Sequence, residues 1–228
     1  MQRAIEVIGR IAQRSDRALL FHSASGKDSI ALLDLIAPKF REVVCAYMYV
    51  VKDLEHINRY IAYAQNKYPN VTFVQTPHYA LFGYIKYGYM GCKQNPKQRK
   101  YTMADLTEKL RKKFNIDWAF FGFKQSDSLN RCQMLRTYES QAINEKSKKV
   151  YPLSLYKNSD VLDYIESHGL IKPERYGKGQ SSGTNISDID YLLYLRENYP
   201  GDLRKVCAYF PMVERLLFEH DYEATEAE

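Results

Sequence analysis

The chain has 228 residues, of which 45% are hydrophobic and 26% are charged, close to the average of globular proteins. This composition excludes disordered and fibrous proteins, and a chain of this length can bury most of its apolar surface without disulfides. Its 33 Lys and Arg residues outnumber its 27 Asp and Glu residues, giving a net charge of +6. A basic balance of this kind favours polyanionic partners such as nucleotides and nucleic acids.

The cysteines and histidines show no spacing typical of a metal site. Cys45, Cys92, Cys132 and Cys207 are widely separated and form no C-x-x-C pair, which argues against a disulfide framework, a zinc site or an iron–sulfur cluster. No apolar run approaches the roughly 20 residues that span a bilayer. The charged, periodic N-terminus differs from a signal peptide. We therefore expect a cytoplasmic protein without zinc, an iron–sulfur cluster or a membrane association.

Predicted strands and helices alternate along the first 123 residues. In chain order, the apolar spacing predicts a helix over about residues 2–14, a strand over 18–23, a helix over 29–37, a strand over 41–51, a helix over 54–68, a strand over 71–76, a helix over 102–114 and a strand over 116–123. This alternation is typical of a doubly wound, mostly parallel, Rossmann-like α/β sheet. In such sheets, ligands bind beyond the carboxyl ends of the strands.

The pattern changes beyond residue 150 to helices and turns. Helices are predicted over residues 158–170, 187–200 and 211–222, with an open loop over 172–185. We expect residues 1–150 to form the α/β core. Residues 151–228 are expected to form a helical flank or lid of the same domain.

The segment that carries chemistry is Ser23–Ser29, S-A-S-G-K-D-S, between a predicted strand and a predicted helix. Small residues there allow backbone N–H groups to bind an anion at the helix N-terminus. Lys27 can add a positive charge, Asp28 can bind magnesium, and Ser29 can cap the helix or donate to a phosphate. The alternative is a plain turn capped by Asp28 or Ser29. The segment is not a Walker A loop, because an acidic residue follows Lys27.

Four segments, in order, resemble a known family. Ser23–Ser29 resembles the pyrophosphatase loop, S-G-G-K-D-S, of the adenine nucleotide alpha-hydrolase-like superfamily, and within it the phosphoadenosine phosphosulfate reductase family. Residues 122–131 are similar to that family's second motif, G-x-R-x-x-[DE]-S-x-x-R. Residues 152–165 are similar to its P-L-x-x-W-x-x-x-D-V-x-x-Y-I segment. Residues 91–100 are similar to the region where the reductases carry Cys-Cys and a basic stretch.

The resemblance implies that residues 1–150 bind ATP or a related adenine nucleotide with Mg²⁺. It implies chemistry at the α-phosphate, either adenylation with release of pyrophosphate or transfer of sulfur or a sulfonucleotide. The catalytic residues it implies are Lys27, Lys124 and Arg131. The nucleotide-binding residues it implies are Ser23, Ser25, Gly26, Lys27, Asp28, Ser29, Gly122 and Asp127, with Asp28 as the magnesium ligand.

The chain also departs from the family. Ala24 and Ser25 replace the usual Ser and first Gly of the loop, and Lys124 replaces an Arg, which keeps the charge but loses the bidentate fork. Tyr156 stands where Trp is common, and the loop over residues 177–185 has Ser-Ser-Gly-Thr where relatives often have cysteines. The C-terminal catalytic cysteine of the reductases has no counterpart. We therefore expect no thioredoxin-dependent reduction of sulfonucleotides.

Two further features each have two interpretations. Cys92 lies next to Lys93 in a basic stretch that would lower its pKa, or it is an ordinary half-buried cysteine. Asp127 and Arg131 form a simple i,i+4 ion pair, or Arg131 and Lys124 reach phosphates while Asp127 orients them.

The stretch from Tyr84 to Tyr101 combines four tyrosines with five basic residues and no acid. It predicts a contact with a nucleic acid or a protein acceptor, or else a solvated flank of the active site. The altered loop and the missing cysteines leave an alternative function, a non-catalytic module that binds nucleotide or nucleic acid. The resemblance to compact reductase-like proteins without the thiol residues implies an origin in a phage or mobile element. We also expect a homo-oligomer.

Overall fold

The computed structural model describes residues 1–176 and 185–226. The chain forms two compact units. Unit 1 comprises Met1–Met48, Tyr60–Thr76 and Ala104–Pro173. Unit 2 comprises Tyr49–Arg59, Pro77–Met103 and the chain from Glu174 onward. Residues 151–173, expected as part of a helical flank, thus belong to the same unit as the first strand.

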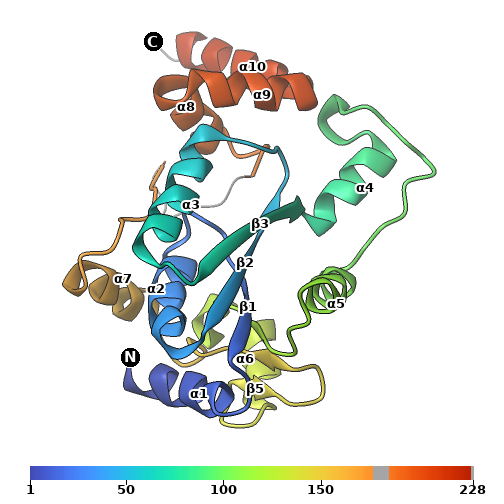
Figure 1. Ribbon diagram of the computed structural model, residues 1–228. Coiled ribbons are helices and arrows are strands. Elements are labelled where there is room, and N and C mark those ends of the chain that lie inside the picture. The colour runs from blue at the N-terminus through green and yellow to red at the C-terminus, as the bar shows by residue number, and fades with distance from the viewer. Residues whose placement is uncertain (177–184, 227–228) are drawn as a thin grey trace. The chain divides into compact units, whose positions relative to one another are not determined.

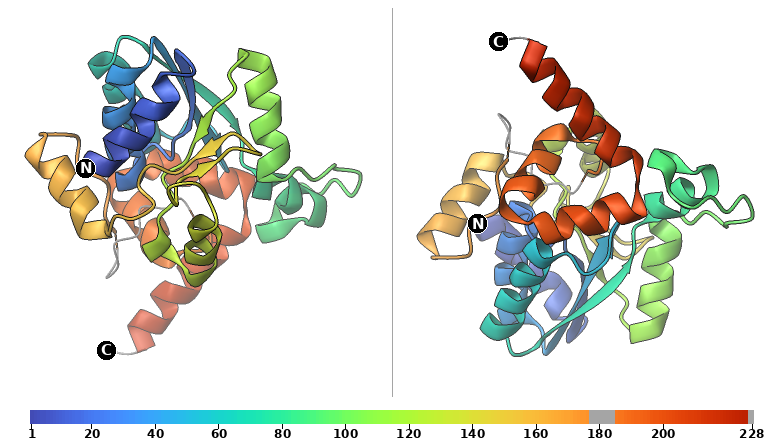
Figure 2. Two further views of the ribbon diagram at one scale, coloured as in Figure 1. Left: turned by 90° about the horizontal axis from the view of Figure 1, so that it is seen from below. Right: turned by 90° about the horizontal axis from the view of Figure 1, so that it is seen from above.

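Unit 1 contains most of the alternating elements (Figure 1). In chain order these are α1 Gln2–Ala12, β1 Arg17–Phe21, α2 Lys27–Ile36, the 3-10 turn η1 Ala37–Lys39, β2 Glu42–Tyr49, α3 Glu55–Lys67, β3 Val71–Pro77, α5 Met103–Phe114, β4 Ala119–Phe120, η3 Gln125–Asp127, α6 Leu129–Arg136, β5 Ile143–Asn144, β6 Lys149–Val150 and α7 Asn158–Ser167. The first turn of α3 and the last residues of β2 and β3 fall in unit 2. Helices α2 and α5 lie on opposite sides of the strands (Figures 1 and 2).

The six strands form one sheet in the order β3-β2-β1-β4-β6-β5. Strand β1 is parallel to both β2 and β4, with Leu20 opposite Cys45 on one side and Phe120 on the other. Strand β6 continues parallel to β4, and β5 returns antiparallel to β6. The predicted doubly wound, mostly parallel α/β fold is confirmed. The strand order reverses between β1 and β4, which is where such sheets bind ligands.

Burial on both faces explains the apolar strands. Ala18, Leu19 and Leu20 of β1 have no exposed surface, and Phe21 stacks on Phe121 with ring centroids 4.8 Å apart. A strand that is covered on both faces has a continuous apolar sequence rather than alternating apolar and polar residues. Helix α2 ends at Ile36 and continues directly into η1, where Ala37 keeps a right-handed helical backbone with φ −50° and ψ −44°. Pro38 has no N–H, so it cannot extend the α-helical hydrogen-bond ladder.

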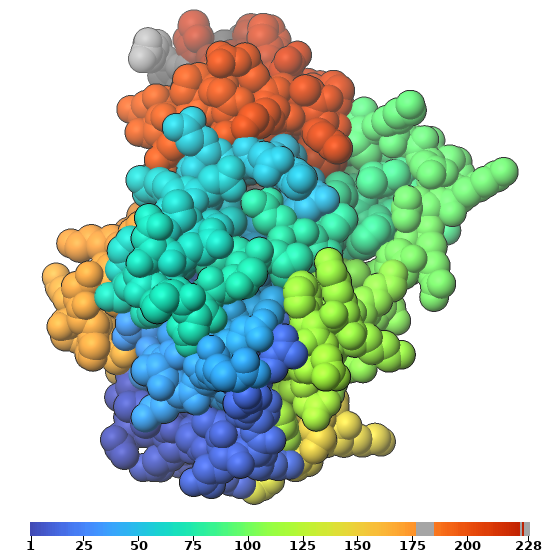
Figure 3. Space-filling view, viewed as in Figure 1, coloured from blue at the N-terminus to red at the C-terminus, as the bar shows by residue number. Residues whose placement is uncertain are grey.

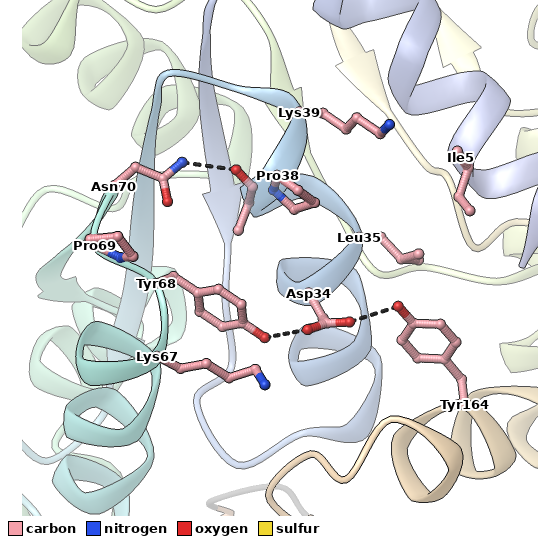
Figure 4. Close-up of a pocket in the computed structure, with 11 residues that line it drawn as sticks. Ile5, Asp34, Leu35, Pro38, Lys39, Lys67, Tyr68, Pro69, Asn70 and Tyr164 are labelled. Atoms are coloured by element: carbon pink, nitrogen blue, oxygen red, sulfur yellow. Dashed lines mark hydrogen bonds between the residues drawn. The ribbon is translucent and has the colours of Figure 1, made fainter.

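A carboxylate joins α2 to two other parts of unit 1 (Figure 4). Asp34 accepts hydrogen bonds from the hydroxyls of Tyr68, which follows α3, and Tyr164, which lies on α7, at 2.6 and 2.7 Å. Burial, together with the neighbouring carboxylate, raises the pKa of both tyrosines. The cluster lines a pocket of about 580 Å³.

Unit 2 is helical and contains α4 Tyr79–Tyr87, the 3-10 turn η2 Tyr89–Gly91, α8 Ile189–Asn198, α9 Pro200–Tyr209 and α10 Met212–Glu226. The buried Asp202 of α9 accepts hydrogen bonds from the backbone N–H groups of Glu55 and His56, at 2.8 and 3.0 Å. It also pairs with Nδ1 of His56 at 2.8 Å. Asp202 therefore caps the first turn of α3.

Several elements were not expected from the sequence. Helix α4 contains Gly83 and several aromatic residues, whose low helix propensity weakens a helix prediction. The sequence predicts Pro200 as the last residue of a helix, but Pro200 is the first residue of α9, where its missing N–H costs nothing. The strand predicted over residues 116–123 has only Ala119 and Phe120 in the ladder. None of the described helices is both long and apolar enough to cross a membrane.

Candidate functional site

The segments that follow β1 and β4 lie together in unit 1. The two strands are adjacent and parallel, so the chain leaves both at the same edge of the sheet. Residues 22–29 connect β1 to α2, and residues 121–128 connect β4 to α6 through η3. The sequence predicted chemistry in both segments.

Side chains close the loop between β1 and α2. Ser29 Oγ accepts a hydrogen bond from the N–H of Ser23 at 3.0 Å and lies 2.9 Å from Ser23 Oγ. Ala24 has the left-handed φ of 58°, and its N–H donates to His22 Nδ1 at 2.9 Å. Burial lowers the pKa of His22 to about 3, so the imidazole is neutral and Nδ1 can accept this bond.

Helix α2 begins at Lys27, and its N-cap is Gly26, which has no side chain to cap it. The predicted caps Asp28 and Ser29 lie instead at the second and third helical positions, and neither side chain caps the helix. The N–H groups of Gly26, Lys27 and Asp28 have no hydrogen-bond partner among the described residues. Unpaired N–H groups at a helix N-terminus attract anions, and Lys27 adds a full positive charge beside them.

Gly122 allows the second segment to approach the first turn of α2. A Cβ on Gly122 would lie 3.1 Å from Asp28 Cβ, closer than most side chains approach each other. A side chain at this position would therefore have to displace Asp28 by a few tenths of an ångström. This contact places the residues after β4 directly beside the loop.

A row of side chains with alternating charge connects residues 22–29 to residues 121–131. Lys124 has no exposed surface, and its Nζ lies 2.7 Å from Asp28 Oδ1 and 2.9 Å from Asp127 Oδ1. Lys27 Nζ lies 3.2 Å from Asp28 Oδ2, and Arg131 lies 2.6 Å from Asp127 Oδ2. The contacts of Lys124 Nζ are ion pairs by distance and lack regular hydrogen-bond geometry. Three cations and two carboxylates leave one net positive charge.

Asp127 is held as a carboxylate by its neighbours. Burial alone would raise its pKa, but the backbone N–H of Lys124, the ammonium of Lys124 and Arg131 together lower it below the ordinary value. The N–H of Lys124 donates to Asp127 Oδ2 at 2.8 Å. Arg131 also lies over the ring of Phe123, 4.0 Å from its centroid. These contacts fix the position of the guanidinium.

Lys27 and Arg131 are accessible, whereas Lys124 is not. Their side chains are 16% and 40% exposed, so a ligand at this edge can reach both. Lys124 was expected to contact phosphate, but it lies between the two carboxylates and is fully buried. Ser25 is buried in the loop and Ser23 is exposed.

Residues 152–165, which resemble the P-L-x-x-W segment of the family, form hydrogen bonds with η3. The N–H of Gln125 donates to the carbonyl of Ser154 at 2.8 Å, and Ser126 Oγ donates to the carbonyl of Tyr156 at 3.1 Å. These bonds hold the turn that carries Asp127. The predicted segment over residues 177–185 lies outside the described residues except for Asn185.

The residues around Asp28 do not fit a bound magnesium ion as they are arranged. Each carboxylate oxygen of Asp28 already lies near an ammonium group, at 2.7 and 3.2 Å. Over residues 1–176 and 185–226, no three His, Cys, Asp or Glu side chains form a group that could hold a metal.

Cys92 does not have the environment of a reactive thiol. It is buried, and its Sγ donates to the carbonyl of Tyr84 at 3.2 Å. Burial raises its pKa, which is opposite to the lowering considered from the neighbouring Lys93. The structural role of His22 in the loop was not predicted from the sequence. Its position, as a polar residue at the end of the apolar run before the loop, is the signal that points to it.

Comparison with known proteins gives one family match. The sequence profile of the phosphoadenosine phosphosulfate reductase domain matches residues 18–199, which include both segments of the charged cluster. No curated protein matches the chain.

Three solved structures are similar at low identity. Phosphoadenylyl-sulfate reductase from Candida auris, in a phosphate complex, is 16% identical with a TM-score of 0.49, covering 80% of this chain and 90% of that one. The NH₃-dependent NAD synthetase from Campylobacter jejuni subsp. jejuni NCTC 11168, in complex with nitrate, is 12% identical with a TM-score of 0.47, covering 98% and 93%. The U34-tRNA thiolase from Methanococcus maripaludis, with its 4Fe-4S cluster, is 14% identical with a TM-score of 0.44, covering 94% and 78%.

Proposed function

Because the chain belongs to the phosphoadenosine phosphosulfate reductase domain family, we propose that it binds ATP or a related adenine nucleotide and acts at its α-phosphate. The observation that carries this proposal is the start of α2. The N–H groups of Gly26, Lys27 and Asp28, which no described residue pairs, lie there beside the ammonium of Lys27. This arrangement suits a polyphosphate.

In the proposed reaction, an acceptor nucleophile bonds to the α-phosphorus while the bond from that phosphorus to the bridging oxygen breaks. Pyrophosphate is the leaving group. Lys27 and the loop N–H groups would stabilise its charge, and Arg131 would bind a phosphate oxygen from the other side. Positioning and electrostatic stabilisation suffice for this chemistry, so no protein nucleophile is needed.

Lys124 would act as a positioning residue. It is buried between Asp28 and Asp127, which in turn contact Lys27 and Arg131. Removing it would leave two carboxylates to repel each other and shift both cations. Magnesium would enter with the nucleotide, as part of the substrate. The absence of zinc and of an iron–sulfur cluster stays a prediction.

The environments of Cys45, Cys92 and Cys207 favour nucleotidyl or sulfur transfer in which none of these three thiols takes part. Burial raises the pKa of Cys45, Cys92 and Cys207. A raised pKa keeps a thiol protonated and weakens it as a nucleophile. We therefore expect no sulfite release with thioredoxin.

The test is pyrophosphate release from ATP by purified Lys27→Ala. We expect the rate to fall to background while the circular dichroism spectrum and melting temperature stay unchanged. Lys39→Ala is the matched control and should keep the wild-type rate, because Lys39 is an exposed lysine in η1, beyond the C-terminal end of α2. An unchanged rate in folded Lys27→Ala would overturn the proposal.

A second candidate is a module that binds nucleotide without turnover. It is favoured by Ala24 and Ser25 in place of the usual loop residues and by the two lysines that hold Asp28. Titration that shows ATP binding, with no pyrophosphate under any acceptor, would support it. A cytoplasmic location, an origin in a phage or mobile element and a homo-oligomeric state stay predictions.

A further inference from the structure

The part of unit 2 between Pro77 and Met103 contains no acidic residue. The average composition of the chain would place about three acids in a stretch of this length. The stretch holds five bases instead, namely Lys86, Lys93, Lys97, Arg99 and Lys100. A cluster of positive charges on one segment is the electrostatic signature of a surface that binds polyanions.

These bases are available to a ligand. Across the described residues, none of the five forms an ion pair with a carboxylate. All except Lys86 are exposed, and the atoms of this stretch, coloured green, lie at the surface in Figure 3. Lys100 and Arg99 lie against tyrosine rings, 5.6 and 5.2 Å from their centroids. The positive charges are therefore interleaved with aromatic rings.

Not all the tyrosines of the stretch are free to bind. Tyr84 packs edge-on against Phe210, and Tyr101 packs against Phe82, at centroid distances of 6.2 and 4.8 Å. Tyr87, by contrast, is 64% exposed, and Tyr209 of α9 is 55% exposed. Two tyrosines exposed to this degree offer flat surfaces on which a nucleobase can stack.

A groove of about 570 Å³ lies within unit 2, bordered by α4, residues 92–95 and α9. Its lining includes the apolar Leu81 and Ile85, the exposed polar residues Lys93 and Gln94, and the ring of Tyr209. A volume of this size is typical of a small-molecule site. An apolar wall, an aromatic ring, an amide and a cation together suit a nucleobase with its phosphate.

We propose that this surface binds single-stranded nucleic acid. One base stacks on Tyr209 in the groove, and Lys97, Arg99 and Lys100 contact phosphates along the strand. Stacking requires an unpaired base, so the surface selects single strands over a duplex. The proposal does not rest on the nucleotide site of unit 1, and each can fail without the other.

The experiment is fluorescence anisotropy with a labelled 12-mer, offered as DNA, as RNA and as a DNA duplex over a series of salt concentrations. The first variant removes Lys97, Arg99 and Lys100 together by substitution with Ala. We expect at least a tenfold loss of affinity for single strands. The slope of log K against log salt should fall by about 2, since each single-strand phosphate contact contributes about 0.7.

The second variant is Tyr209→Leu, which keeps an apolar side chain and removes the ring. We expect a loss of about fivefold to hundredfold with an unchanged salt slope, because stacking on one base is lost and no charge is removed. The matched control replaces Lys112, Lys113 and Lys146 with Ala, three exposed bases outside unit 2. It removes the same charge and should bind with nearly wild-type affinity.

The proposal is overturned if wild-type protein fails to bind either strand at low salt, or binds the duplex as tightly. It is also overturned if the control loses as much affinity as the first variant. The DNA and RNA arms identify which single strand is preferred. ATP titration of each variant, expected to match wild type, keeps this outcome separate from the site of unit 1.

Discussion

Lys124 has no exposed surface, and its ammonium lies between the carboxylates of Asp28 and Asp127. Replacing it with Met should lower the free energy of unfolding by about 3 kcal/mol, because two partly buried carboxylates lose their cation. Urea unfolding measures the change. Arg131→Met is the control, and it should cost less than about 1 kcal/mol, since that arginine is partly solvated. Equal losses in the two variants would contradict the role of Lys124.

The lowered pKa of Asp127 predicts that the stability of the protein depends on pH. In the folded protein the pKa of Asp127 lies below its ordinary value. The carboxylate therefore adds its full contribution to the free energy of unfolding above the unfolded pKa near 3.9, and this contribution is lost as the pH falls through the folded pKa. We expect the unfolding free energy of wild type to drop more between pH 6 and about pH 3 than that of Asp127→Asn. Parallel curves for the two proteins would show that the carboxylate contributes nothing.

His22 supports the loop through a single hydrogen bond to the N–H of Ala24. His22→Leu removes the acceptor, and we expect ATP affinity to fall by about twofold to tenfold, the worth of one net hydrogen bond. His22→Asn places Oδ1 near the former Nδ1 and should restore the affinity. Isothermal titration distinguishes the two, with melting temperatures as a check on folding. Failure of the Asn variant to recover affinity, while it stays folded, would contradict this role.

At the scale of elements, Asp34 fixes α2 against Tyr68 and Tyr164 (Figure 4). Asp34→Ala should lower the free energy of unfolding by about 3 kcal/mol, because two hydrogen bonds to a charged acceptor are lost. Tyr68→Phe and Tyr164→Phe should each cost about half as much. A double-mutant cycle between Asp34→Ala and each Phe variant measures the coupling, and zero coupling would contradict the account.

The sequence predicts the parallel strands of unit 1 because each is a short apolar run next to a turn of small residues. It also predicts that the loop at Lys27 and the segment at Lys124 share one edge, since both follow strands of the same sheet. It does not predict the burial of Lys124, because a lysine in a turn is usually solvated and only the tertiary contacts with Asp28 and Asp127 reverse this. Helix α4 was not predicted because its composition is unfavourable, and its ends are set by caps: the His78 side chain accepts from the N–H of Ala80, and Gly88 has the left-handed φ of 66°.

At the scale of the whole molecule, the net charge of +6 has two local origins. In unit 1, the charged cluster after β1 and β4 carries one net positive charge. In unit 2, the stretch from Pro77 to Met103 carries five bases without an acid. The composition gives only the total charge, and the structure separates a compact cluster of paired charges in unit 1 from a stretch of unpaired bases in unit 2 among the described residues.

The most direct test of the central claim is isothermal titration of wild type and Lys27→Ala with ATP and magnesium. We predict saturable binding of one nucleotide per chain to wild type, and a loss of at least tenfold in affinity for the variant, because the loop loses its only full positive charge. Binding of equal affinity to both proteins, or no binding to wild type, would contradict the assignment of the loop between β1 and α2 as the site for the nucleotide phosphates.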